Sequence, residues 1–161
     1  MLGADVVELL ESGCGLIIGL ATPDGTPIAC RGWGLTVHPG GTRVTVLADA
    51  DDLAEIDARP GHIPATTIAV TGTAILTLRS AQVKGPLVEV VPVDDALAQR
   101  LATYCDAFFH DVAVVDAIPR FLMERLVPAD VVACTVDVVE LYDQTPGPGA
   151  GRPLPQGGAL R

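Results

Sequence analysis

Leu16-Ile17-Ile18-Gly19-Leu20-Ala21-Thr22-Pro23-Asp24-Gly25-Thr26-Pro27 decides the fold class of this chain. Its first six residues form the longest apolar run, which predicts a buried β-strand. The segment Pro23-Asp24-Gly25 is typical of a tight hairpin turn, and a second strand is expected over residues 27–38. Because so short a turn joins only antiparallel strands, we expect the sheet to begin as a hairpin.

The remainder of the chain repeats this pattern of short strands and turns. After a second turn at Pro39-Gly40-Gly41, apolar and polar side chains alternate along residues 42–48. Further strands are expected over residues 67–78, 87–93 and 131–141. About six strands joined mainly by hairpins predict a small antiparallel β-barrel.

Helices are expected outside this barrel, over residues 5–12, 49–58, the segment that begins at Asp94-Asp95, and 120–126. The pattern after Asp94-Asp95 is the clearest, because Leu97, Leu101 and Phe108 recur on one helical face. Pro119 is suited to open the last helix. These helices are expected to pack on the outside of the barrel.

Length and composition indicate one folded domain with a tail. A chain of 161 residues, 49% of them hydrophobic, can bury a substantial core. We expect a barrel domain over residues 1–143 and a Pro/Gly-rich C-terminal arm over residues 144–161. The arm is too rich in proline and glycine for a helix or strand, and beyond Arg152 we favour a frayed tail.

The charge balance excludes several classes of protein. A net charge of −10 with no basic stripe argues against nucleic acid as a partner. No apolar run approaches the ~20 residues that cross a bilayer, and the first residues, Met1-Leu2-Gly3-Ala4-Asp5, lack the positive region of a signal peptide. We therefore expect a cytoplasmic protein with no membrane partner. The scattered cysteines and histidines predict free thiols and no metal site.

One compact polar cluster stands out in this acidic chain. Arg79-Ser80-Ala81-Gln82-Val83-Lys84-Gly85 contains the chain's single lysine together with an arginine, a serine and a glutamine. Such a group, placed between two expected strands, can hold an anion. The alternative is a strand edge with solvated charges.

With these elements in order, the sequence resembles the pyridoxamine 5′-phosphate oxidase-like family, the flavin-binding split barrels, over roughly residues 5–141. The resemblance rests on Leu9-Leu10-Glu11-Ser12-Gly13-Cys14-Gly15-Leu16-Ile17-Ile18-Gly19, the hairpin that follows it, Arg31-Gly32-Trp33-Gly34, and the polar cluster. It implies a mainly β (α+β) fold: a six-stranded antiparallel Greek-key split β-barrel with peripheral helices.

The resemblance also implies a homodimer that binds FMN in clefts at the subunit interface and carries out a redox step on a small molecule. Pyridoxamine phosphate itself is not the expected substrate, because the C-terminal Trp and Arg of the true oxidases have no counterpart here. The residues that match cofactor-binding positions are Arg31, Gly32, Trp33 and Gly34 on the second strand, and Arg79, Ser80, Gln82 and Lys84 in the polar cluster. No catalytic residue can be named.

A second reading stays open beside this one. The loop Ala48-Asp49-Ala50-Asp51-Asp52 holds acids where flavin-binding relatives commonly carry Ser or Thr with Arg or Lys, and carboxylates repel a phosphate. The chain can therefore be a non-catalytic split barrel that binds another flat ligand, such as the deazaflavin F420, or no cofactor. For Trp33 the alternative is ordinary core packing, and for Gly32 and Gly34 it is a bulge.

Overall fold

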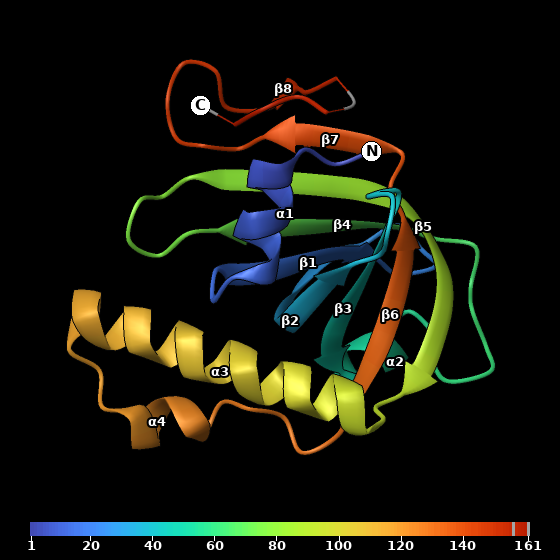
Figure 1. Ribbon diagram of the computed structural model, residues 1–161. Helices are drawn as coiled ribbons and strands as arrows, with labels where there is room; N and C mark the ends of the chain where they lie inside the picture. Colours follow the sequence, from blue (N-terminus) through green and yellow to red (C-terminus); the bar gives the residue numbers. More distant parts are fainter. Residues whose placement is uncertain (156, 161) are drawn as a thin grey trace.

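The computed structural model describes residues 1–155 and 157–160, which form one antiparallel sheet and four helices (Figure 1). The strands are β1 Gly15–Ala21, β2 Pro27–Val37, β3 Arg43–Asp49, β4 Thr67–Thr73, β5 Ser80–Pro92, β6 Val131–Asp137, β7 Glu140–Asp143 and β8 Arg152–Pro153. The helices are α1 Ala4–Glu11, α2 Ala50–Ala54, α3 Asp95–Asp116 and α4 Arg120–Glu124.

The sheet closes on itself, which confirms the expected six-stranded antiparallel barrel. Its strands follow the order β4-β1-β2-β3-β6-β5, and β5 pairs back with β4. Beyond this ring, β7 pairs with the first part of β5, and β8 pairs with β7. The opening hairpin is antiparallel, as expected, and its register runs from Leu16 opposite Gly32 to Ala21 opposite Pro27.

Side chains point alternately into and out of the barrel along each strand, and those that point inward form the core. The inward positions are apolar and fully buried, among them Leu16, Ile18, Val44, Val46, Ile68 and Val70. Helix α1 contributes Leu10, whose side chain reaches the inward face of Gly72. All four cysteines are buried and free, as expected.

Helix α3 packs along the outside of β2, with the short α4 beside it (Figure 1). Two polar contacts fix its position. The buried hydroxyl of Tyr104 donates to the carbonyl oxygen of Cys14 at 2.9 Å, and Arg100 Nε donates to the carbonyl oxygen of Leu35 at 2.8 Å. No helix among the described residues is long and apolar enough to cross a membrane.

The strand expected over residues 67–78 ends earlier, at Thr73. The chain then turns, with Leu78 in the left-handed region at φ 59°, and re-enters the sheet at Ser80. Residues 80–85 of the polar cluster therefore lie within β5 and not in a connection between two strands. The threonines and apolar residues of 74–78 suggested a continuing strand, whereas the tertiary pairing of β4 with β5 places the hairpin turn there.

The strand expected over residues 131–141 is also interrupted. β6 pairs with the second half of β5, whereas β7 pairs with its first half. The chain changes partner at Val138 and Val139, where the backbone passes directly over Gly85. Only a residue without a side chain leaves room for this crossing.

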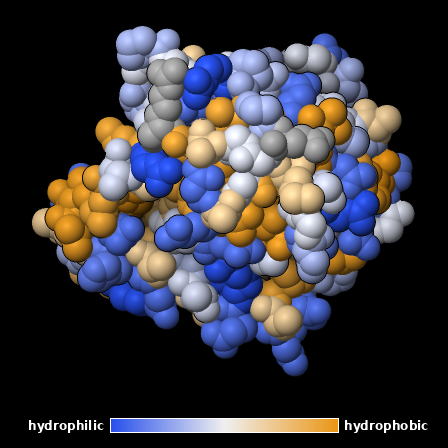
Figure 2. Space-filling model, turned by 45° about the horizontal axis from the view of Figure 1, so that its top comes forward, coloured by the Kyte–Doolittle hydropathy of each residue, from blue (hydrophilic) through white to orange (hydrophobic). Residues whose placement is uncertain are grey.

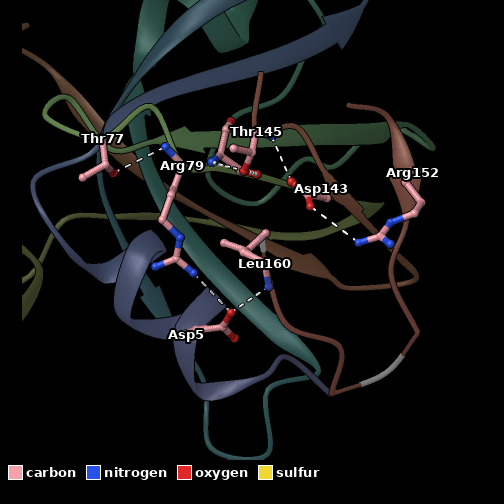
Figure 3. A network of polar contacts seen from close by, with 8 residues as sticks. Asp5, Thr77, Arg79, Asp143, Thr145, Arg152 and Leu160 are labelled. Carbon is pink, nitrogen blue, oxygen red and sulfur yellow. Dashed lines mark hydrogen bonds and ion pairs between the residues drawn. The ribbon is translucent and has the colours of Figure 1, made fainter. Parts of the chain in front are cut away.

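Among the residues after Arg152 that the structure describes, Leu160 packs against the rest of the protein, so the expectation of a frayed tail there is wrong. Leu160 is 8% exposed, and its backbone N–H donates to Asp5 Oδ2 at 2.7 Å. Asp5 also forms an ion pair with Arg79 at 3.5 Å, so one carboxylate connects α1, the β4–β5 turn and the end of the arm (Figure 3). These contacts involve residues far apart in sequence, so composition alone did not reveal them.

Asp143 holds the start of the arm. Its side chain is 2% exposed; Oδ1 accepts from the backbone N–H of Thr145 at 3.0 Å, and Oδ2 lies 3.7 Å from Arg152 Nη2 (Figure 3). The backbone oxygen of Asp143 also accepts from the N–H of Gly151 at 2.7 Å. A buried carboxylate with such partners organises the loop between β7 and β8.

We expect Asp143→Ala to release the arm. Removing its side-chain interactions with Thr145 and Arg152 should cost about 1–3 kcal/mol and should increase hydrogen exchange in residues 144–152 at least about tenfold. Asp137→Ala is the matched control, because its ion pair with Arg43 is exposed and should contribute less than about 1 kcal/mol. Unchanged exchange in residues 144–152 of Asp143→Ala would contradict this role.

Candidate functional site

One outer face of the barrel has no buried side chain. We define the open face by nine outward-pointing residues: Ile17, Gly19, Ala29, Arg31, Ala69, Thr71, Gln82, Lys84 and Tyr142. Each is partly or fully exposed, and Ile17 is 47% exposed. Gly19, Ala29 and Ala69 carry little or no side chain, so a ligand can approach the backbone there. Two of them carry positive charge, and none is a carboxylate.

The strand register orders the open face into rows. One row runs from Arg31 on β2 through Ile17 and Thr71 to Gln82 on β5 and Tyr142 on β7. The neighbouring row contains Lys84. The strands β1 and β4 lie between β2 and β5, so three strand spacings, about 14 Å at the backbone, separate Arg31 from Gln82, and Lys84 lies one row further along β5. The two cations share a face, but the structure does not bring them together around one phosphate group.

Arg31 is held between aromatic rings where α3 meets the open face. Its guanidinium carbon lies 4.2 Å from the centroid of the Phe108 ring and 5.2 Å from that of Trp33. Its Nε and Nη2 atoms are buried, with no hydrogen-bond partner among the described residues. Cation–π contacts offset part of the cost of burying this charge, but they satisfy none of its N–H donors. Guanidinium donors left unsatisfied beside the open face favour an anionic ligand, which can reach them only if the Arg31 side chain or α3 moves aside.

Burial is the main cause of the shifted pKa values of Tyr104 and Cys14, near Arg31. It raises the pKa of the Tyr104 hydroxyl, and the charge of Arg31 opposes this shift only in part. Tyr104 is therefore neutral at physiological pH and serves as a hydrogen-bond donor to Cys14. Burial likewise raises the pKa of the Cys14 thiol to about 11, so this sulfur is no nucleophile at neutral pH.

The three residues after Arg31, which are Gly32, Trp33 and Gly34, contribute to packing and to the shape of β2. Trp33 is 3% exposed, which agrees with the core-packing alternative. A Cβ on Gly32 would lie 2.8 Å from Leu16 Cβ inside the barrel. Gly34 has φ 125° at a bulge in β2, where a Cβ would lie 3.3 Å from that of Tyr104. These glycines let β2 bend and let α3 approach closely.

Arg79 and Ser80 lie at the end of the barrel near α1, beyond the open face. Arg79 pairs with Asp5, and the hydroxyl of Ser80 donates to the carbonyl oxygen of Gly72 at 3.1 Å. The backbone N–H of Ser80 donates to Thr145 Oγ1 at 3.1 Å (Figure 3). Both predicted residues are thus engaged with the protein's own N-terminal helix and arm.

Gln82 and Lys84 do lie on the open face, beside β7. Gln82 Nε2 donates to Thr71 Oγ1 at 2.8 Å, and Lys84 Nζ lies 4.8 Å from the centroid of the Tyr142 ring. Glu140 stands directly opposite Lys84 in the β5–β7 ladder. The sequence did not indicate Tyr142 as a site residue, because the last strand was expected to end at residue 141. Phe108 was interpreted only as a core residue of the helix.

In the acidic loop after β3, no positively charged group contributes to the shifted pKa of Asp52. The Asp49 side chain accepts from the Asp51 N–H at 3.0 Å and so caps α2. Burial, together with the charge of Asp49, raises the pKa of Asp52. Burial and the nearby Asp52 raise the pKa of the Cys30 thiol to about 12. This corner of the molecule therefore repels a phosphate, as its sequence predicts.

The cavities of the single chain lie elsewhere. One, of about 610 Å³, is lined mainly by apolar residues and prolines between α2, α3 and the start of β6, with Arg59 and Asp130 also in its wall. A cavity of 190 Å³ between α1 and the β4–β5 turn includes Arg79. The surface has hydrophobic patches broken by polar side chains (Figure 2). Among the described residues, no group of His, Cys, Asp and Glu side chains could hold a metal ion.

Comparison with solved structures shows the same architecture in other proteins. An F420 reductase is 18% identical over 83% of this chain and 93% of its own, with a TM-score of 0.51. HupZ of Group A Streptococcus is 11% identical over 94% of this chain and 100% of its own, with a TM-score of 0.53. The fold is the split barrel.

A third, weaker likeness is to a pyridoxamine 5′-phosphate oxidase-related, FMN binding protein from Nostoc punctiforme. It is 14% identical over 84% of this chain and 78% of its own, with a TM-score of 0.41. No protein-family model and no curated protein matches the sequence. The likeness to the F420 reductase and to HupZ confirms the split-barrel fold that the sequence resemblance implies.

Proposed function

We propose that this split barrel binds a flavin or deazaflavin, FMN or F420, on its open face as a homodimer, and that the bound cofactor supports a redox step on a small molecule. The observation that carries this proposal is Arg31 at the edge of the open face, with buried Nε and Nη2 donors that have no hydrogen-bond partner among the described residues. When bound, the cofactor supplies the hydride or electron chemistry, while the protein binds and orients it.

The open face also favours the homodimer. Ligand sites are usually concave, and none of the cavities described above is lined by Arg31, Gln82 or Lys84. A second chain laid on the face would turn it into a cleft. The chain carries a net charge of −10, so two copies repel each other least where carboxylates are missing.

The likeness to an F420 reductase adds F420 to FMN as a candidate, because both ligands carry a flat ring and an anionic tail. Arg31 would attract the anionic part, and the small side chains of β1 and β4 would let a ring approach the sheet. The acidic loop opposes a phosphate at the neighbouring corner, which favours a ligand that keeps its negative charge close to Arg31.

The test is an absorbance spectrum of the freshly purified protein, followed by titration with FMN and with F420. We expect a cofactor band, or saturable binding of one of the two compounds with a change in its fluorescence. A colourless protein that binds neither compound would overturn the proposal.

The second candidate function, a split barrel without redox activity, is favoured by one observation. Lys84 stands opposite Glu140 and over the ring of Tyr142, so its charge is already compensated within the chain. This candidate predicts a homodimer that forms normally and binds no cofactor.

A further inference from the structure

The C-terminal part of the chain adds side chains to the open face. β7 extends the sheet beyond the closed barrel, and Tyr142 takes the place next to Gln82 in the row that begins at Arg31. Gln144, just after β7, donates from Nε2 to Gln82 Oε1 at 3.4 Å. Lys84 Nζ lies 4.8 Å from the centroid of the Tyr142 ring. Gln82 and Lys84, the two predicted ligand residues of β5 that lie on the open face, thus both contact this C-terminal segment.

The charges at this end of the face cancel. Lys84 is the only cation among these residues, and Glu140 stands opposite it in the ladder. Glu140 also accepts a hydrogen bond from the Tyr142 hydroxyl, and this bond raises the pKa of Tyr142. A neutral end of the face has little attraction for a phosphate, whereas Arg31 at the other end has unsatisfied donors.

The groups beside Tyr142 suit the ring of the ligand better than its phosphate. An aromatic side chain offers a stacking surface to a flat ring. The amides of Gln82 and Gln144 each carry a donor and an acceptor, and the pyrimidine edge of a flavin or deazaflavin alternates acceptors with a donor. Lys84 has a flexible stem, so its ammonium group can leave the Tyr142 ring when another group takes its place.

We propose that Tyr142 is a ring-binding and specificity-determining residue of the open face: it stacks on the ligand's ring, the Gln82–Gln144 pair binds the polar edge of that ring, and the anionic tail extends toward Arg31. This inference rests on the proposed flavin or deazaflavin binding. It assigns a binding role to the C-terminal extension of the barrel, and it orients the ligand across the sheet.

The test compares binding of FMN with binding of riboflavin, which has the same ring but no phosphate, by fluorescence titration of the full-length chain. Loss of a stacking contact typically weakens binding about tenfold. We expect Tyr142→Ala to weaken FMN and riboflavin by the same factor, and Tyr142→Phe to keep near wild-type affinity for both. Arg31→Met should weaken FMN more than riboflavin. If F420 is the compound that binds, the F420 affinities of Tyr142→Ala and Tyr142→Phe are compared with that of the wild-type chain.

The outcomes separate this inference from the proposed function. Wild-type binding that Tyr142→Ala leaves unchanged would overturn the role of Tyr142 and leave flavin binding intact. If Tyr142→Ala weakens the binding of FMN but not of riboflavin, Tyr142 lies beside the phosphate and not the ring. This result would also overturn the proposed orientation of the ligand. If the wild-type chain binds none of the three compounds, both proposals fall. Melting temperatures of the variants show whether each is folded, and Tyr142→Leu, of similar size, replaces Tyr142→Ala if the alanine variant unfolds.

Discussion

Replacing Gly85 with alanine should destabilise this protein more than replacing any other glycine of the sheet with alanine. A Cβ at Gly85 would overlap the backbone carbonyl oxygen of Asp137 and lie 3.3 Å from the Val139 N atom. Backbone atoms cannot move aside as a flexible side chain can. We therefore expect a loss of at least about 3 kcal/mol in the free energy of unfolding, measured by urea denaturation.

Gly15→Ala is the matched control, because Gly15 also lies in a strand of the barrel. Its Cβ would meet Ile75 Cδ1 at 3.4 Å, an ordinary contact, so the free energy of unfolding should change by less than about 1 kcal/mol. If Gly85→Ala were as stable as Gly15→Ala, the crossing of the β6–β7 segment over β5 would be placed wrongly.

Replacing Ile17 with glutamate should convert the proposed dimer into a monomer. Ile17 lies within the open face, between Arg31 and Thr71 in the strand register. A carboxylate there would be desolvated when a second chain covers the face, at a cost of several kcal/mol. We expect the dimer dissociation constant to rise at least about 100-fold, and sedimentation should give the 16.6 kDa of one chain instead of twice that mass.

Val139→Glu provides the comparison, because it adds the same charge at another exposed apolar position. Val139 is 70% exposed and lies outside the open face, between β6 and β7. This variant should remain dimeric. A dimer that survives Ile17→Glu, or one that dissociates equally in both variants, would remove the open face as the interface.

The sequence was sufficient for the elements whose cause is local. The hairpin from Gly15 to Val37 follows from an apolar run and a Pro-Asp-Gly turn, and its two strands pair antiparallel as expected. Helix α3 begins where Asp94 caps it, through a bond from the Leu97 N–H at 2.9 Å. Capping and hydrophobic periodicity act within a few residues, so these features can be read without knowledge of the tertiary structure.

Features that depend on distant contacts were not predictable. The interruption between β6 and β7 arises because β5 changes partner along its length, and nothing near Val138 in the sequence indicates this. The order of the arm depends on Asp143 and on Asp5, the latter lying at the opposite end of the chain.

The candidate site was predicted in part. Arg31, Gln82 and Lys84 do share one face, but Arg79 and Ser80 are engaged at the end of the barrel, and Trp33 is buried. Of the two aromatic rings around Arg31, that of Phe108 comes from α3, more than 70 residues further along the chain, which no local pattern in β2 could reveal.

The central claim is that a flavin or deazaflavin binds the open face, and amide chemical-shift changes on titration with FMN or F420 test it most directly. We predict the largest changes in β1, in β4 and in the first half of β5, at Gly19, Thr71 and Gln82. Changes confined instead to the walls of the 610 Å³ cavity, at Arg59, Leu101 and Asp130, would contradict the account and place the ligand between α2 and α3.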